Sequence, residues 1–166
     1  MKRHKLESAS NADATLVAAR ELLAKRGIAF TVIRGSIFEL LCRESKAVSA
    51  YALVSAFEKE SGRRITPQTV YRALDFLEQQ GLVAHLLNTR TYVARSPDYD
   101  DETSLYFVCS ACGITAESKD RHVERAVRLS ANTIGFVARG CVIDLAGLCR
   151  QCSLARKDEQ SATSRT

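Results

Sequence analysis

The chain has 166 residues, of which 46% are hydrophobic and 26% are charged. This composition predicts an ordinary soluble protein of one or two small domains. No stretch approaches the roughly 20 apolar residues of a membrane span, and the first residues lack the apolar core of a secretion signal. We therefore expect a cytoplasmic protein without membrane contact.

The positive charge of the chain is concentrated in its first part. Residues 1–95 carry 15 Lys and Arg against 9 Asp and Glu, a net +6, whereas residues 96–166 carry 9 against 10, a net −1. A basic domain joined to a neutral one suits a nucleic-acid-binding protein. A solvated surface explains so small an excess equally well.

Three helices are predicted before Thr66 by their apolar periodicity and their caps. The first runs from Asp13 to Arg26 and stops at Gly27. The second follows Thr31, and its expected apolar stripe is Ile33, Ile37, Leu40 and Leu41. The third begins at Ser49, a good N-cap, and buries Leu53, Val54 and Phe57. We expect these helices to share one core.

The fourth helix has the clearest boundaries. Thr66 is a suitable N-cap, Pro67 occupies the first helical position, and Gly81 follows the last residue, Gln80. Val70, Leu74 and Leu77 form its expected buried stripe. Two short apolar runs, 82–87 and 90–94, then flank a polar Asn88-Thr89 corner. Helices followed by such a hairpin predict a winged helix-turn-helix.

In that fold the last helix enters the major groove of DNA with its N-terminal residues at the base edges. Tyr71 and Arg72 are the primary candidates, and the sequence leaves open whether each reads a base or contacts a phosphate. Other candidates share an exposed position near the helix start or in the wing: Gln68, Thr69, Arg63, Arg64, Tyr51 and Arg90. For each of these arginines the alternative is a solvated side chain.

The second half of the chain contains two Cys-x-x-Cys pairs, Cys109 with Cys112 and Cys149 with Cys152. Four thiolates at this spacing predict one closed, structural zinc site. The 36 residues between the pairs leave room for a small folded unit. Two disulfides, free buried thiols and a redox couple are the alternatives, of which disulfides need an oxidising compartment. Cys42 and Cys141 have apolar neighbours and are expected to be small buried hydrophobes.

Around these cysteines we predict strands at 105–109, 136–138 and 141–145 and a helix at 122–132. Val123, Ala126, Val127 and Leu129 are expected on the inner face of that helix, and Gly135 ends it. Three strands and one helix bury too little surface to be stable alone. Pairing with a second copy, together with structural zinc, is therefore expected.

Several motifs in this order resemble the ferric-uptake-regulator superfamily, and its zinc-uptake-regulator branch fits best. They are residues 69–77 (TVYRALDFL), 81–83, 92–93, 107–113 and 147–152, with Ser49-Ala50-Tyr51 also similar. The resemblance implies a homodimeric, metal-dependent repressor that binds double-stranded DNA at a palindromic operator near metal-uptake genes. It implies an α+β protein in which a winged-helix domain precedes a small α/β dimerisation domain.

The expected organisation has five parts. A flexible arm spans 1–12, the winged-helix domain 13–94, a hinge 95–104, the zinc-stapled dimerisation domain 105–152, and a flexible tail 153–166.

The resemblance also implies a second, exchangeable metal site at the hinge, and the chain departs from it there. His85 and Glu117 match two of its ligands, whereas Arg95 and Glu102 stand where two others fall. A guanidinium cannot ligate a metal. Three alternatives remain: Arg95 pairs with Glu102 or Glu117 in place of the metal, Arg95 is solvated, or His85, Glu102 and Glu117 hold zinc weakly, alone or with one Asp of the range 98–101. A second zinc is thus left open.

Other functions are weighed against this one. No Cys and His pairing suggests an activated nucleophile, so an enzyme is not expected, nor is a small-molecule substrate. A redox-responsive regulator that loses zinc on oxidation and a regulator that binds DNA without exchangeable metal are the alternatives. An adaptor that has lost DNA binding is disfavoured by Tyr71 and Arg72.

Overall fold

The computed structural model describes residues 3–95, 103–137 and 141–163. The chain divides into two compact units, Met1–Glu102 and Thr103–Thr166, which are described separately. This division falls within the range 95–104, where the sequence predicts a hinge. None of the helices in the described ranges is long and apolar enough to cross a membrane.

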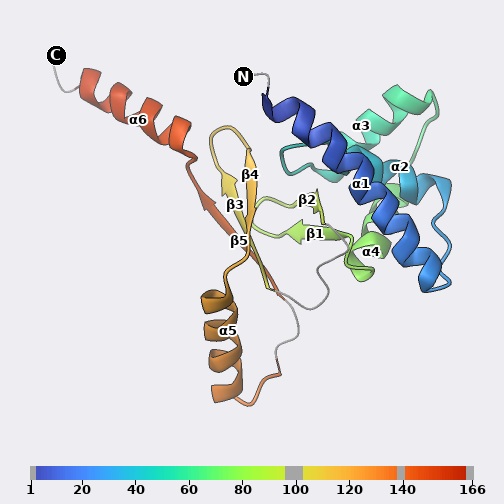
Figure 1. Ribbon diagram of the computed structural model, residues 1–166. Coiled ribbons are helices and arrows are strands. Elements are labelled where there is room, and N and C mark those ends of the chain that lie inside the picture. The colour runs from blue at the N-terminus through green and yellow to red at the C-terminus, as the bar shows by residue number, and fades with distance from the viewer. Residues whose placement is uncertain (1–2, 96–102, 138–140, 164–166) are drawn as a thin grey trace. The chain divides into compact units, whose positions relative to one another are not determined.

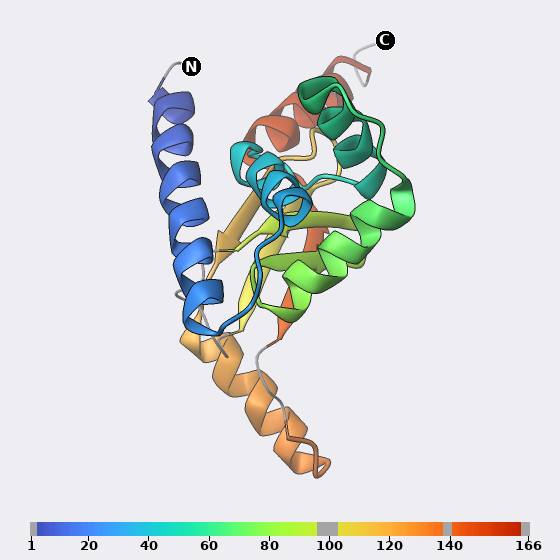
Figure 2. The same ribbon diagram turned by 90° about the vertical axis from the view of Figure 1, so that its right-hand side faces the viewer.

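The first unit contains four helices and a two-stranded hairpin (Figures 1 and 2). The helices are α1 (Arg3–Lys25), α2 (Val32–Arg43), α3 (Ala50–Ser61) and α4 (Pro67–Gln79), and the strands are β1 (Val83–Leu86) and β2 (Thr91–Ala94). α2 packs against α1, α3 and α4, so it lies at the centre of the unit. This is the predicted winged helix-turn-helix.

The core of the first unit is built from the apolar stripes of all four helices. Its fully buried residues include Leu23, Ile37, Phe38, Leu53, Val70, Leu74 and Leu77. The stripe predicted for α4 is confirmed. On α2 the prediction was wrong at one position, because Ile33 is 38% exposed and Phe38 is buried instead.

The predicted helix caps of α3 and α4 are confirmed. The Ser49 hydroxyl accepts a hydrogen bond from the Ala52 N–H at 3.2 Å. The Thr66 hydroxyl accepts one from the Thr69 N–H at 3.2 Å, and Pro67 begins α4. Each cap satisfies one of the N–H groups that a helix start leaves without an intrahelical partner.

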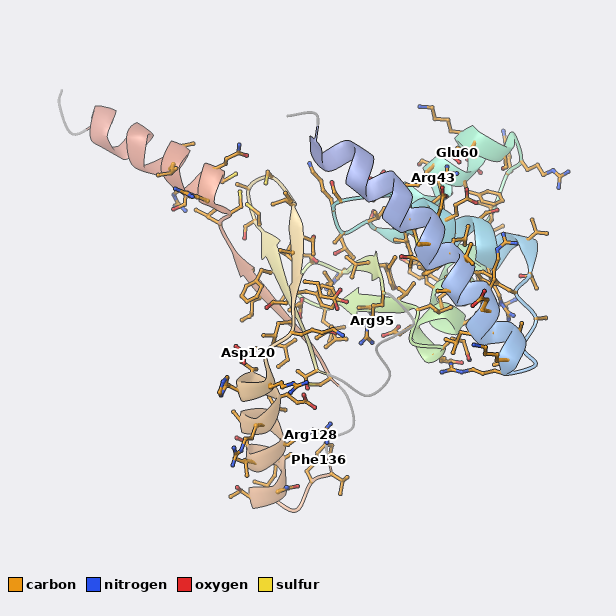
Figure 3. All side chains as sticks on the ribbon, viewed as in Figure 1. Arg43, Glu60, Arg95, Asp120, Arg128 and Phe136 are labelled. Atoms are coloured by element: carbon orange, nitrogen blue, oxygen red, sulfur yellow. The ribbon has the colours of Figure 1, made fainter. Side chains whose placement is uncertain are left out.

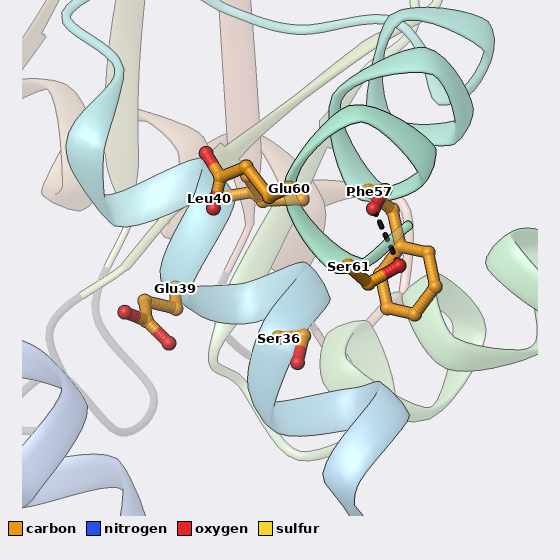
Figure 4. A pocket seen from close by; sticks show the side chains of 6 residues that line it. All are labelled: Ser36, Glu39, Leu40, Phe57, Glu60 and Ser61. Atoms are coloured by element: carbon orange, nitrogen blue, oxygen red, sulfur yellow. Dashed lines mark hydrogen bonds between the residues drawn. The ribbon is translucent and has the colours of Figure 1, made fainter. Parts of the chain in front are cut away.

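A shallow hollow lies between α2 and α3 of the first unit (Figure 4). It is lined by Ser36, Glu39, Leu40, Phe57, Glu60 and Ser61. At its side Arg43 donates to Glu60 at 3.0 Å and also to Glu39 (Figure 3). All three charged side chains are largely exposed, so these ion pairs contribute little to stability and serve to join the two helices.

The second unit holds a three-stranded sheet and two helices: β3 (Ser104–Cys109), β4 (Thr115–Ser118), α5 (Arg121–Thr133), β5 (Val142–Gly147) and α6 (Arg150–Thr163). The sheet order is β4-β3-β5, with β4 antiparallel and β5 parallel to the central strand. A parallel pair requires a long crossover, and α5 supplies it.

Several sequence predictions for this unit were wrong. β4 was not predicted, and residues 136–137 have no regular structure where a strand was expected; Ala138 lies outside the described residues. α5 has no fully buried residue: of the four residues predicted to point inward, Val123 and Val127 are half-buried, whereas Ala126 is exposed and Leu129 is 58% exposed. In Figure 1 this helix extends from one end of the sheet instead of covering it.

The ends of the chain also differ from the sequence prediction. α1 begins at Arg3, within the arm predicted for residues 1–12, and not at Asp13. α6 continues to Thr163 through the range 153–166 that was predicted as a tail without apolar periodicity. Both segments are polar, and apolar periodicity gave no signal for either helix.

Truncation of Leu74 tests the packing of α4. The side chain is fully buried, so Leu74→Ala is expected to lower the free energy of unfolding of the first unit by about 2 to 5 kcal/mol in a urea titration. Leu87→Ala is the control, because Leu87 is 72% exposed and its loss is expected to change stability by less than about 0.5 kcal/mol. Equal effects of the two changes would contradict this packing.

Candidate nucleic-acid interface and metal centre

The N-terminal end of α4 combines a secured cap with exposed polar side chains. Besides its bond to the Thr69 N–H, the Thr66 hydroxyl lies 2.8 Å from the Thr69 hydroxyl. The remaining N–H groups of the first turn carry the positive end of the helix dipole, which favours an anion such as a phosphate. No acidic side chain lies in that turn to neutralise it.

The two faces of α4 differ sharply in exposure. Val70, Leu74 and Leu77 are fully buried, and they hold the helix against the core. Tyr71 is 39% exposed and Arg72 is exposed beside it. Because burial of one face fixes the rotation of the helix about its axis, Tyr71 and Arg72 are held at the surface.

The structure distributes the other DNA candidates around this helix. Gln68 is exposed and Thr69 half-buried on its first turn, and Arg63 and Arg64 are exposed in the loop before it. Tyr51, at the start of α3, is 67% exposed. Arg90 is exposed in the turn between β1 and β2, with its backbone in the left-handed region at φ 53°.

The wing is tied to the helices through Tyr92, a residue of the 92–93 motif for which the sequence predicted no structural role. Its N–H and carbonyl exchange hydrogen bonds with Val48 at 2.8 and 2.9 Å, directly before the N-cap of α3. Its ring lies flat against the imidazole of His85, its cross-strand partner, with centroids 4.5 Å apart. Burial raises the pKa of Tyr92, and the phenol of Tyr71 adds to the effect.

The residues proposed for the exchangeable metal site are divided between the two units. His85 and Arg95 belong to the first unit, Glu117 lies on β4 of the second, and Glu102 lies outside the described residues. The Arg95 N–H donates to the Leu82 carbonyl at 2.8 Å, which fixes its backbone beside the wing. Figure 3 marks its side chain, whose Nε is buried.

In the second unit the register of one strand pair brings the two cysteine pairs together. β3 and β5 run in parallel with Cys109 opposite Gly147, two residues before Cys149. The Ser110 N–H donates to the Gly147 carbonyl at 2.8 Å, and the Cys149 N–H donates to the Cys109 sulfur at 3.3 Å. The sheet therefore positions both pairs at one end.

The first cysteine pair also reverses the chain from β3 into β4. The Gly113 N–H donates to the Cys109 carbonyl at 2.8 Å, and the Cys109 N–H donates to the Ile114 carbonyl at 2.9 Å. Gly113 has φ 75°, a conformation that glycine adopts without strain. This turn is the signal from which β4 could have been predicted.

The four sulfurs fit a tetrahedral zinc ion. All lie within 4.8 Å of one another, and the Cys112 and Cys149 sulfurs are 3.8 Å apart. A tetrahedron with Zn–S bonds of about 2.3 Å has edges of about 3.8 Å. Within the described ranges of the chain, these cysteines form the one cluster of three or more potential ligands. With four protein ligands such a site has no open position for a substrate.

The thiols of this cluster interact strongly with one another. Hydrogen bonds from the Cys149 and Cys112 N–H groups lower the pKa of Cys109 to about 6. Hydrogen bonds with the Cys149, Cys112 and Cys109 sulfurs raise the pKa of Cys152 to about 12. The backbone thus favours the thiolate form of Cys109, while Cys152 needs a bound cation to lose its proton near neutral pH.

The other two cysteines lie apart from this cluster. Burial, with a contribution from the Glu39 carboxylate, raises the pKa of Cys42 to about 12, so its thiol stays protonated. Cys42 packs against the core of the first unit. Cys141 donates a weak hydrogen bond to the Thr103 hydroxyl at 3.4 Å. The Cys42 thiol therefore lacks the low pKa of a reactive cysteine.

The fold, the exposed start of α4 and the cysteine cluster define a class of protein: a winged-helix protein with a second, α/β unit that carries a four-cysteine metal site. Residues 25–145 match the model of the "Ferric uptake regulator family". The chain belongs to that family, as its motifs predicted.

Relatives of known function span most of the chain. The "Zinc uptake regulation protein" of Escherichia coli (strain K12) is 36% identical over 138 residues, which cover 82% of this chain and 80% of the relative. The "Peroxide operon regulator" of Bacillus subtilis (strain 168) is 27% identical over 81% of this chain and 91% of its own length.

Solved structures of similar proteins share the fold of this chain. "Zinc Uptake Regulator Complexed With Zinc AND DNA" is 33% identical, with a TM-score of 0.80 over 88% of this chain and 97% of that chain. "Crystal structure of holo XcZur" is 28% identical, with a TM-score of 0.73 over 85% of this chain and 98% of that chain.

Loss of one clustered cysteine tests the metal centre. We expect the purified protein to hold one zinc per chain by elemental analysis, and Cys152→Ser to weaken zinc binding more than about 100-fold in a chelator competition, because even residues that only support a ligand cost 10- to 100-fold. Cys141→Ser is the control, since Cys141 lies outside the cluster. An unchanged zinc affinity in Cys152→Ser would contradict the assignment.

Proposed function

We propose that this protein is a sequence-specific DNA-binding repressor of the zinc-uptake-regulator type that controls zinc-homeostasis genes in the cytoplasm. The observation that carries the proposal is the start of α4, where a capped helix end presents Tyr71 and Arg72 at the surface. The similarity to a zinc uptake regulator in complex with zinc and DNA supports it. In this role the protein is a regulator and not an enzyme.

The chemistry of these side chains suits a duplex. A guanidinium can donate two parallel hydrogen bonds to a guanine edge or to a phosphate, and a tyrosine can contact a thymine methyl or donate to a phosphate. The exposed Arg63, Arg64 and Arg90 add positive charge around α4 for phosphate contacts. Gln68, Thr69 and Tyr51 extend the same proposed surface.

A homodimer on a palindromic operator follows from the second unit. Within this unit α5 has no buried residue, and Leu129, Ile134, Phe136 and Val137 are all more than half exposed. Apolar side chains gathered in this way favour burial against a partner. A second copy would cover them, and two-fold symmetry would present two α4 helices to two half-sites.

Structural zinc at the four cysteines would hold this unit in the form that dimerises. The ion would connect the ends of β3 and β5, which are far apart in sequence. Zinc in small folded units contributes on the order of 10 to 16 kcal/mol, comparable to the whole stability of a small domain.

Replacement of Arg72 tests the interface. Arg72→Met is expected to weaken binding to a duplex selected from a random pool by the wild-type protein about 10- to 100-fold, because a bidentate contact is lost. Arg20→Met, on the exposed side of α1, removes the same charge and is the control. The measurement is a fluorescence titration at fixed salt. Equal affinities of the two variants would argue against α4 as the reading helix.

A second candidate function is favoured by Arg95: a family regulator whose DNA binding does not depend on exchangeable metal. The resemblance places a hinge ligand at this position, and a guanidinium stays protonated and repels an incoming cation. His85, the other first-unit candidate, has its ring stacked on Tyr92. Together these features disfavour a conventional second zinc site.

Metal counting distinguishes the two candidates. If Arg95 replaces the sensing metal, mild chelation is expected to leave one zinc per chain and to change DNA affinity less than about twofold. Arg95→Cys, which supplies a thiolate ligand, is expected to gain a second, removable zinc. A second zinc in the wild-type protein, whose removal releases DNA, would instead establish the metal-responsive repressor.

A further inference from the structure

Two arginines outside α4 hold the C-terminal end of that helix. Arg26 follows the last residue of α1, and its Nη1 donates to the Gln80 carbonyl at 3.2 Å and lies 3.4 Å from the Gln80 Oε1. These residues are 54 positions apart in the sequence. The contact therefore joins the C-terminal end of α1 to the C-terminal end of α4.

Arg34, in the first turn of α2, makes the second contact. Its guanidinium carbon lies 3.5 Å from the centre of the Phe76 ring, a cation–π arrangement with the last part of α4. The same guanidinium donates through Nη1 to the Ala29 carbonyl at 3.0 Å, which fixes its position. Both Arg34 and Phe76 are half-buried, so the contact is shielded from water on one side.

The C-terminal end of α4 needs such partners. The last carbonyls of a helix carry partial negative charge, which cations stabilise, and α4 has no basic residue in its last turn. Glu78 adds a further negative charge there. Arg26 and Arg34 supply from outside the positive charge that the helix itself lacks.

Contacts at the C-terminal end of α4 determine the direction of its axis, and therefore the position of the residues at its N-terminal end. Eight residues separate Arg72 from Gln80, or about 12 Å along the axis. A tilt of about 10° at Gln80 would therefore move the Arg72 backbone by about 2 Å, and a hydrogen bond to a base edge does not survive such a shift.

We propose that Arg26 and Arg34 are positioning residues for DNA recognition, which set the angle at which α4 presents Tyr71 and Arg72. The proposal rests on the proposed DNA-binding function. It predicts a particular defect: variants at these positions lose discrimination between sequences, while their electrostatic attraction to any duplex is kept.

The test uses the full-length protein and two probes, a duplex selected from a random pool by the wild-type protein and a random-sequence duplex. Arg26→Met and Arg34→Met are each expected to weaken binding to the selected duplex about 3- to 30-fold. Affinity for the random duplex is expected to change less than twofold, with an unchanged salt dependence. Arg20→Met, which removes one exposed charge from α1, is the control and is expected to match the wild type.

Arg34→Lys adds a readout that a loss of charge would not produce. It keeps the cation but loses the flat guanidinium, so its discrimination is expected to lie between those of the wild type and Arg34→Met. All titrations are run below the melting temperature of the least stable variant, as measured by circular dichroism. A structural role alone would lower melting temperatures and leave both affinities of the folded variants unchanged, which would overturn the proposal.

Two other results are distinguishable from this one. If affinity for both duplexes falls equally and the slope of log affinity against log salt shrinks by about 0.9, the arginines contact phosphates and the positioning role is wrong. If the wild-type protein selects no duplex from the random pool, sequence-specific DNA binding itself fails, and the positioning role fails with it.

Discussion

The parallel pairing of β3 with β5 is the constraint on which the second unit depends. Cys109 ends β3 opposite Gly147, and this register alone places Cys149 against the Cys109 sulfur. A shift of one residue would turn every side chain of the strand to the opposite face and separate the sulfurs. Zinc at the four cysteines would in turn forbid that shift, so strand register and metal site stabilise each other. Parallel pairs form slowly, because their contacts are distant in sequence, and a metal that selects one register offsets this disadvantage.

The first unit depends on a different principle, the orientation of one helix. The buried face of α4 fixes its rotation, since Val70, Leu74 and Leu77 leave no alternative side for the core. Thr66 secures its first turn, and the pairing of Tyr92 with Val48 ties the wing to the start of α3. The buried face and the capped first turn together hold the exposed residues of α4 in one place.

The accuracy of the sequence predictions follows from how local each signal was. The start of α3 and both ends of α4 could be predicted because Ser49, Thr66, Pro67 and Gly81 act within one turn of the chain. The cysteine cluster was similarly accessible, since each pair carries its own spacing. β4 was missed because Thr115–Ser118 has no apolar alternation and forms only because the turn at Gly113 returns the chain along β3. The stacking of His85 on Tyr92 depends on hairpin register, which residue types alone do not specify.

The error at α5 has a physical cause that also bears on function. Its apolar residues have helical spacing, and the sequence correctly predicted a helix, yet in the part of the chain that the structure describes none of them is fully buried. Apolar periodicity predicts that one face of a helix will be buried. It does not predict whether the same chain or a second molecule buries that face. The four-cysteine site also bears on function. Because protein sulfurs take all four coordination positions, a bound zinc would exchange slowly and would stabilise the fold rather than sense metal. A response to a changing metal concentration would then need a different set of ligands, and Arg95 cannot be one of them, because a guanidinium has no lone pair to offer a cation.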